Sequence, residues 1–101
     1  MSVTKVVRYT TKPEHAEENE RLIRKVFAEL AELEPDGIRY AAFRLDDGVS
    51  FVHVAVLEGD QNPLARSVAF GQFQSAIGER CADGPVAADA TVVGSYRMPV
   101  E

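Results

Sequence analysis

The chain is short and acidic. It has 101 residues, of which 46% are hydrophobic and 27% charged, and its 16 acidic and 11 basic side chains give a formal net charge of −5. This length suits one domain, and the composition is typical of a folded protein rather than a disordered one, so we expect residues 1–101 to form a single domain. An acidic chain without a basic cluster excludes nucleic acid as a natural partner, because phosphate contacts need grouped Lys and Arg.

The sequence also lacks the signals of a metal site or a membrane segment. Cys81 is the one cysteine, and the two histidines do not fall in a metal-binding spacing. Residues 1–5 lack the apolar segment of a signal peptide, and apolar runs such as residues 54–57 are far shorter than the roughly 20 residues of a spanning helix. We therefore expect a cytoplasmic protein that binds no metal and no membrane.

The first predicted elements are a strand and a long helix. Residues 3–10 are rich in β-branched and aromatic side chains, which predicts a strand. The sequence then predicts a helix over residues 11–34, with Thr11 as its cap, Pro13 in its first turn and Glu14 completing a capping box. Apolar side chains recur there at helical spacing. They are Leu22, Ile23, Val26, Phe27, Leu30 and Leu33.

A hairpin and a second helix follow. Residues 38–45 and 49–57 are predicted to pair around a turn that ends at Gly48.

The second helix is expected over residues 62–81. Asn62 is its predicted cap, and the sequence allows a break near Ser67. Residues 83–85, Asp-Gly-Pro, are predicted to end this helix, and residues 91–97 to form the last strand.

The order β-α-β-β-α-β predicts an α+β fold of the ferredoxin-like kind, with an antiparallel sheet that carries both helices on one face. The other face of such a sheet normally alternates with polar residues. Residues 51–57 break this pattern, because His53 is the one polar side chain among them. A sheet that is apolar on both faces needs a second cover, and a second copy of the chain is the simplest one, so we expect a homodimer.

Three segments resemble a known family. Residues 6–9, Val-Val-Arg-Tyr, followed by Pro13 and an acidic helix, resemble the antibiotic biosynthesis monooxygenase superfamily. Residues 51–54 and 70–74 are similar to small members of this group. The resemblance spans nearly the whole chain and implies a dimeric α+β barrel. Members include cofactor-free monooxygenases of polyketide quinols and anthrones, quinol monooxygenases and haem-degrading enzymes.

The sequence departs from two branches of this superfamily. The polyketide oxygenases use Trp, Asn, Tyr and Arg around a planar phenol, whereas this chain has no Trp. The haem-degrading branch is typified by Asn in the first strand and His on the second helix, and neither is present here. The resemblance therefore implies an enzyme without haem, flavin or other cofactor: a cofactor-independent monooxygenase of an aromatic polyketide or quinol. A non-catalytic module of the same fold, which binds a small aromatic molecule or only dimerises, is the alternative.

His53 is the first candidate for chemistry, because it interrupts an apolar strand. A hairpin loop of two or four residues pairs Ala42 with His53 and Arg44 with Phe51, and it places Tyr40 on the same face. A loop of three residues would move Tyr40 and Arg44 to the other face.

This cluster suits oxygenation without a cofactor. Such a reaction needs a base that converts a phenol into its phenolate, which then passes an electron to dioxygen. His53 is the candidate base, and Tyr40 or Arg44 would hold the oxyanion. The alternative is a structural histidine that is hydrogen-bonded in the core. Four aromatic side chains are candidates to line an apolar pocket for a planar ligand, or else belong to the ordinary core. They are Phe27, Phe51, Phe70 and Phe73.

Overall fold

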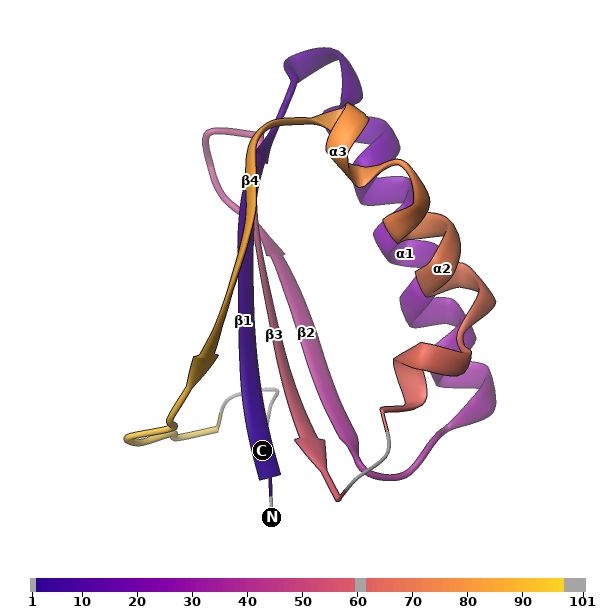
Figure 1. Cartoon of the computed structure of the whole chain (residues 1–101), viewed down its shortest axis with the longest axis vertical. Helices are drawn as coiled ribbons and strands as arrows, with labels where there is room; N and C mark the ends of the chain where they lie inside the picture. The colour runs from indigo at the N-terminus through magenta and orange to yellow at the C-terminus, as the bar shows by residue number, and fades with distance from the viewer. Residues whose placement is uncertain (1, 60–61, 98–101) are drawn as a thin grey trace.

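The computed structural model describes residues 2–59 and 62–97. Four strands form one antiparallel sheet in the order β2-β3-β1-β4, and the helices lie on one of its faces (Figure 1). The chain is therefore α+β and ferredoxin-like, as predicted. The elements are β1 (Ser2–Thr11), the 3₁₀ helix η1 (Pro13–His15), α1 (Ala16–Leu33), β2 (Ile38–Arg44), β3 (Ser50–Glu58), the 3₁₀ helix η2 (Pro63–Arg66), α2 (Val68–Ser75), α3 (Ile77–Arg80) and β4 (Cys81–Ala90).

The core lies between the sheet and the helices. Strand residues alternate between the two faces, so every second side chain of β1, β2 and β3 points toward α1 and α2. The apolar stripe of α1 faces the same layer, which is why this long helix packs along the sheet. The buried cluster is Tyr9, Ile23, Val26, Phe51, Leu64, Phe73 and Cys81.

The first helix begins later than predicted. Thr11 is the last residue of β1, where its backbone N–H and its hydroxyl both donate to the carbonyl of Val49. Thr11 is therefore engaged by the sheet and does not cap a helix. Residues 13–15 form the 3₁₀ turn η1, and α1 begins at Ala16. The helix ends where expected, because Glu34 adopts a left-handed conformation with φ 45°.

The second helical stretch is divided. Asn62 accepts a hydrogen bond from the Leu64 N–H, as a cap should, but the turn that it caps is η2. Ser67 is extended and its hydroxyl oxygen accepts from the Phe70 N–H, so it starts a separate helix, α2. The break near Ser67 is therefore confirmed. Ala76 separates α2 from the short α3.

The prediction of the last strand was wrong. Residues 91–97 form neither strand nor helix, and the fourth strand is β4, which pairs with β1. Residues 83–85 do not end a helix but lie inside this strand. Gly84 has φ 87°, and the pairing of β4 with β1 shifts register twice near it. The strand therefore contains a bulge at these residues and continues beyond them. Pairing with β1 decides the strand's position, against the higher β-propensity of residues 91–97.

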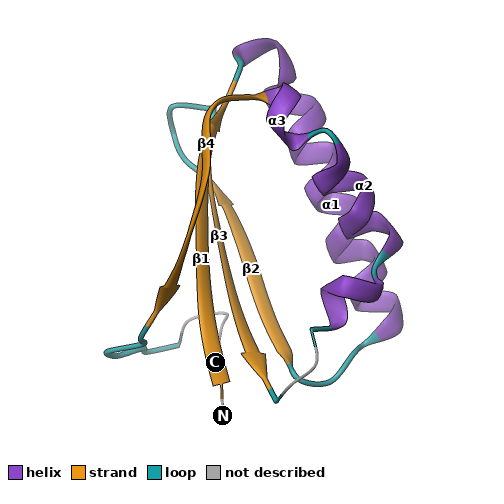
Figure 2. Ribbon diagram, viewed as in Figure 1, coloured by secondary structure: helices purple, strands orange, loops and turns teal. Residues whose placement is uncertain are grey.

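The helices leave one face of the sheet uncovered (Figure 2), and the centre of this face is apolar. Val6, Val54 and Ala41 lie side by side across its centre, and each is only partly buried. Toward the two edges of this face, Phe43 is 39% and Val86 54% exposed. Both faces of the sheet therefore carry apolar side chains, as the sequence indicates, and the helices cover one of them. The exposed Arg8, which pairs with Val52, also lies on the uncovered face.

The two glycines Gly84 and Gly71 give a matched test of the β4 geometry. A Cβ at Gly84 would lie 3.1 Å from the Arg8 carbonyl oxygen and 3.2 Å from Tyr9, and φ is positive. We expect Gly84→Ala to lower the free energy of unfolding by about 1–3 kcal/mol. Gly71 lies in α2 with nothing within 4 Å of such a Cβ, so Gly71→Ala should stabilise by about 0.5–1 kcal/mol. Urea unfolding measures both, and a neutral Gly84→Ala would contradict this description of β4.

Candidate functional site

His53 lies at the centre of the core and is bonded on both sides. Its side chain is 5% exposed, its Nε2 lies 2.7 Å from the Tyr9 hydroxyl, and its Nδ1 lies 2.6 Å from the Tyr40 hydroxyl. The sheet explains this placement. His53 on β3 pairs with Val7 on β1 and Ala42 on β2, so Tyr9 and Tyr40 are its diagonal neighbours on the same face.

The hydrogen bonds continue from Tyr9 into the helices. The Tyr9 hydroxyl oxygen accepts from Asn19 Nδ2 at 2.9 Å, and Asn19 Oδ1 accepts from Arg80 Nε at 3.0 Å. Asn19 on α1 is 0% exposed and Arg80 at the end of α3 is 3% exposed. We call these five side chains, Tyr40, His53, Tyr9, Asn19 and Arg80, the buried polar chain. It links three strands and two helices.

Burial favours the neutral forms of His53, Tyr9 and Tyr40 in this chain. It lowers the pKa of His53 to about 4, because the imidazolium would lose its hydration in the core. It also raises the pKa of Tyr9 and Tyr40 above the usual value of 10, although the hydrogen bond from Asn19 opposes the rise at Tyr9. At neutral pH, His53 is therefore a neutral imidazole, in which one ring nitrogen donates and the other accepts.

Arg80 brings a buried positive charge to the end of the chain. It donates to Asn19 and to the Phe73 carbonyl, and its guanidinium lies 5.2 Å from the centre of the Phe73 ring. Within residues 2–59 and 62–97, no carboxylate lies at ion-pair distance from Arg80. Because a buried charge is costly without polar partners, the amide of Asn19 and the carbonyl of Phe73 are needed to hold it.

Arg44 is placed on the predicted face but is engaged elsewhere. The predicted register is confirmed, since Ala42 pairs with His53 and Arg44 with Phe51. The Arg44 guanidinium, however, lies 3.0 Å from carboxylate oxygens of both Glu17 and Glu20 on α1. The structure thus brings Tyr40 to His53 and holds Arg44 in an ion-pair cluster, so that a role for Arg44 at an oxyanion stays a prediction.

Aromatic rings surround the buried polar chain. The Tyr9 ring stacks on Phe51 with centroids 5.5 Å apart, and the His53 ring lies 5.4 Å from that of Phe73. Phe51 and Phe73 are among the buried residues of the core. The two remaining candidates lie further out, and they are Phe27, 4.8 Å from Tyr40, and Phe70, 6.1 Å from Phe73. Of the four predicted phenylalanines, Phe73 thus contacts the His53 ring, and the other three contact Tyr9, Tyr40 or Phe73.

Solved structures share this arrangement of strands and helices. No protein-family model matches the chain, and no curated protein matches its sequence significantly. Rv0793 from Mycobacterium tuberculosis superposes with a TM-score of 0.71 at 15% identity, over 94% of this chain and 98% of its own. A protein from Nitrosomonas europaea, provisionally named an antibiotic biosynthesis monooxygenase, gives 0.73 at 13% identity, over 91% and 90%. The chain has the antibiotic biosynthesis monooxygenase fold.

The same fold occurs in a characterised oxygenase. A variant of SnoaB from Streptomyces nogalater, a cofactor-independent oxygenase, superposes with a TM-score of 0.65 at 22% identity, over 96% of this chain and 98% of its own. The resemblance stated from the sequence is therefore confirmed for the fold. Identities this low show the fold alone, and the chemistry has to be argued from the side chains of this chain.

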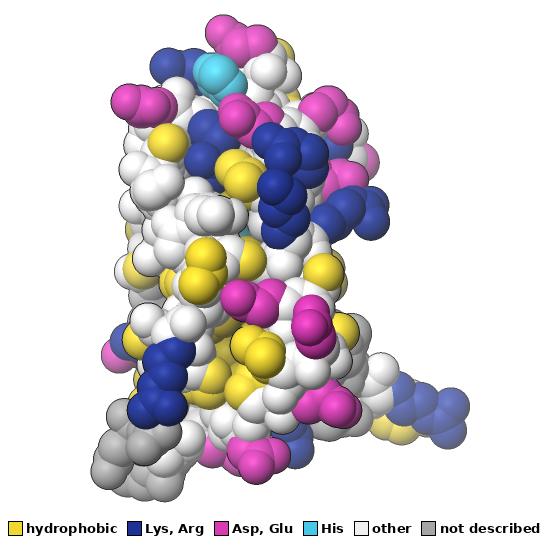
Figure 3. Space-filling view, turned by 90° about the vertical axis from the view of Figure 1, so that its right-hand side faces the viewer, with side chains coloured by type: hydrophobic (Ala, Val, Ile, Leu, Met, Phe, Trp, Pro, Cys, Tyr) yellow, Lys and Arg dark blue, Asp and Glu magenta, His cyan; other side chains and the backbone are white. Residues whose placement is uncertain are grey.

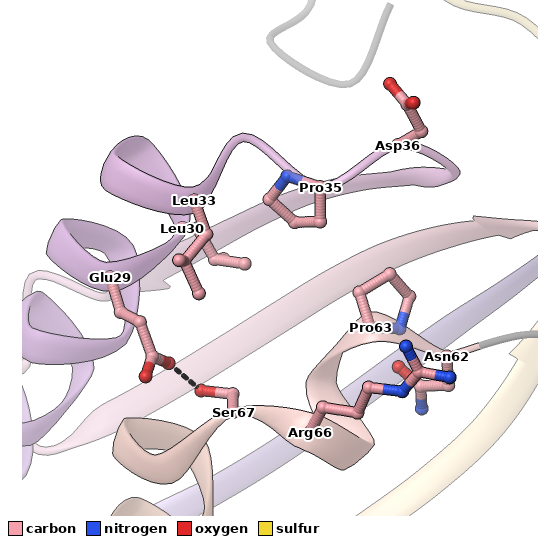
Figure 4. Close-up of a pocket in the computed structure, with 9 residues that line it drawn as sticks. All are labelled: Glu29, Leu30, Leu33, Pro35, Asp36, Asn62, Pro63, Arg66 and Ser67. Atoms are coloured by element: carbon pink, nitrogen blue, oxygen red, sulfur yellow. Dashed lines mark hydrogen bonds between the residues drawn. The ribbon is translucent and has the colours of Figure 1, made fainter.

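Two open pockets lie on this monooxygenase fold. One, of about 340 Å³, lies between the end of α1 and η2, where a Ser67–Glu29 hydrogen bond crosses it and Arg66 borders it (Figure 4). The second, of about 220 Å³, lies between α1 and the edge strand β2, and Ala42 and Phe51 line it. Of these two pockets in the described part of the chain, neither is lined by His53 or Tyr40.

The outer surface of the helix layer carries charges of both signs with apolar groups between them (Figure 3). Among the described residues, no group of three or more His, Cys, Asp or Glu side chains is placed to hold a metal ion. Within the same residues, every helix is too short or too polar to cross a membrane.

Three members of the buried polar chain were not predicted from the sequence: Tyr9, Asn19 and Arg80. A signal existed for two of them. Tyr9 lies two residues after Val7 on the core face of β1, and Asn19 extends the buried side of α1 one turn toward its start. Arg80 carried no such signal, because the breaks between η2, α2 and α3 interrupt the helical period that leads to it.

The low pKa of His53 predicts a pH dependence of stability. The pKa of His53 is about 6.5 in the unfolded chain and about 4 in the folded protein, so the unfolded chain binds the proton more tightly. The contribution of neutral His53 to the free energy of unfolding is therefore fully present above pH 6.5. This stabilisation is lost as the pH falls from 6.5 to 4, by about 3 kcal/mol at most. Urea unfolding at several pH values measures the loss, and His53→Gln, which does not titrate, should lack this component. An NMR titration in which His53 gains its proton near pH 6.5 would contradict the prediction.

Proposed function

We propose that the chain is a cofactor-independent monooxygenase that oxygenates a phenolic aromatic molecule, an aromatic polyketide or a quinol. The observation that carries this proposal is the neutral His53, which is bonded to Tyr40 and in ring contact with Tyr9 and Phe73. A neutral imidazole is a proton acceptor, and aromatic walls suit a planar ring. The fold, which the chain shares with the cofactor-independent oxygenase SnoaB, is consistent with this chemistry.

The proposed reaction needs no external reductant. The phenol gives its proton to the neutral imidazole of His53 and becomes a phenolate. The phenolate passes one electron to dioxygen, and the resulting radical pair combines to form a carbon–oxygen bond and a peroxide. Loss of water then leaves a quinone, so one oxygen atom enters the ring and the other leaves as water. All the electrons come from the substrate.

The pocket at the β2 edge is the proposed entrance for the ligand. Ala42 and Phe51 line it, and both have side chains on the same face of the sheet as His53. Tyr40, on the same strand as Ala42, is less buried than Tyr9, so it is the end of the buried polar chain that a ligand would meet first. Movement of the Tyr40 side chain would open this route to His53.

Oxygen uptake with anthrones and quinols tests this function. We expect the wild-type protein to consume oxygen and His53→Ala to lose about 10²- to 10⁴-fold in turnover, as for a lost general base. His15→Ala is the matched control, because His15 lies on η1, at the start of the first helical segment, with Glu18 as its partner. It should keep full turnover. A wild-type protein that consumes no oxygen with any of these substrates would overturn the proposal.

A second candidate function is a non-catalytic binding or dimerisation module. The observation that favours it is that both ring nitrogens of His53 already have partners and neither pocket reaches them. Under this alternative, His53→Ala removes the hydrogen-bond partner that Tyr9 and Tyr40 share and lowers stability by about 1–3 kcal/mol. Destabilisation of this size together with an inactive wild type would favour the binding module.

We also propose that two copies of the chain associate through their sheets. The apolar face that the helices leave uncovered, with Val54 at its centre and Phe43 toward its edge, carries this proposal. A second copy would cover it with the same surface, as in a two-fold symmetric dimer. The resemblance of the sequence to the dimeric α+β barrels supports the same assembly.

Light scattering at micromolar concentration tests the dimer. We expect the mass of two chains and an interface well above the roughly 1,000 Å² of a specific contact. Val54→Lys should produce monomers, because it places a charge at the centre of the proposed interface. Val68→Lys, on the 69% exposed Val68 of α2, is the matched control and should remain dimeric. A wild-type monomer would reject the proposed association.

A further inference from the structure

Arg80 fixes the orientation of the amide of Asn19. A guanidinium has only donors, so the Asn19 atom that faces Arg80 Nε at 3.0 Å must be the carbonyl oxygen. The amide nitrogen of Asn19 therefore faces the Tyr9 hydroxyl, 2.9 Å away. Because this nitrogen only donates, the Tyr9 oxygen must accept from it. The first two hydrogen bonds of the buried polar chain thus have one possible direction.

The direction of the Asn19–Tyr9 hydrogen bond also fixes the donor and the acceptor between Tyr9 and His53. Its oxygen accepts from Asn19, so its own proton needs another acceptor, and His53 Nε2 lies 2.7 Å away. Tyr9 is 4% exposed, which keeps water from serving instead. The reverse direction would leave the Tyr9 proton buried without an acceptor. His53 Nε2 is therefore the unprotonated nitrogen of the ring.

The direction continues to the last member of the chain. A neutral imidazole without a proton on Nε2 carries it on Nδ1, which donates to the Tyr40 oxygen at 2.6 Å. Among the described residues, His53 is the one hydrogen-bond partner found for the Tyr40 hydroxyl, so the Tyr40 proton points to a further acceptor. Tyr40 is half-buried, and in the proposed function the ligand supplies that acceptor.

We propose that Asn19 and Arg80 are positioning residues that hold His53 in the Nδ1-protonated tautomer, so that Tyr40 presents a hydrogen-bond donor to the ligand. In the terms of the proposed function, on which this part rests, the site selects a ligand through an acceptor oxygen, a carbonyl or a phenolate. A neutral phenol hydroxyl, which must also place its own proton, fits Tyr40 less well. The tautomer itself does not depend on the function.

Nitrogen-15 NMR of the histidine ring tests the tautomer without any substrate. We expect the wild-type spectrum at pH 7 to show protonated Nδ1 and unprotonated Nε2 for His53. Asn19→Asp reverses the chain, because a carboxylate accepts from both Arg80 and Tyr9, and the Tyr9 oxygen must then accept from His53 Nε2. We expect the proton of His53 to move to Nε2 in this variant. The new carboxylate also pairs with the buried Arg80.

Asn62→Asp is the matched control. It makes the same chemical change at the η2 cap, where Oδ1 is the atom in use, and it should leave His53 protonated on Nδ1. A wild-type protein with its proton on Nε2 would overturn the proposal, and this measurement needs no variant to fold. A folded Asn19→Asp protein that keeps the proton on Nδ1 would overturn it as well.

Binding of anthraquinone tests the ligand part, since this planar probe has acceptor oxygens only. We expect Asn19→Asp to weaken its binding about tenfold or more relative to the wild type, because Tyr40 then gives its proton to His53. Equal binding, or no binding to the wild type, would overturn this part. If the wild-type protein consumes no oxygen but has the Nδ1 tautomer, the proposed function is rejected and the hydrogen-bond direction is confirmed. If it consumes oxygen but has the Nε2 tautomer, the function is supported and the hydrogen-bond direction is rejected.

Discussion

The requirement that buried polar groups be fully hydrogen-bonded governs this structure more than any single apolar contact. The buried polar chain takes its members from β1, β2, β3, α1 and α3, and each link is a specific distance between elements. A shift of α1 along the sheet would break the bonds of Asn19 on both sides. Apolar packing tolerates small shifts, whereas these bonds do not, so the polar chain sets the register of the helices on the sheet.

The sequence was most informative where the pattern is local. The hairpin turn fixes the pairing of β2 with β3, and the alternation of strand residues then places Tyr40 and His53 on one face, as predicted. The general order of elements follows from similar local patterns, and it was enough to identify the fold. Tyr40 and His53 could therefore be predicted from one turn and one period.

The rest depends on contacts between distant segments. Arg80 and Asn19 are 61 positions apart, and no local pattern connects them. Arg44 lies on the expected face, but it forms ion pairs with acidic residues of α1. These pairs depend on the packing of that helix on the sheet, which the local sequence pattern does not reveal. The fourth strand was misplaced for the same reason: its position is decided by the free edge of β1, against the intrinsic preferences of its own residues.

The linear form of the buried polar chain has an evolutionary consequence. Asn19, Tyr9 and His53 each hold two neighbours, so that replacing one of them leaves two groups unpaired in the core. Such a change can persist only with a compensating change next to it, or with the replacement of the whole chain by apolar side chains. In proteins that share this chain of side chains, these positions are therefore expected to change together.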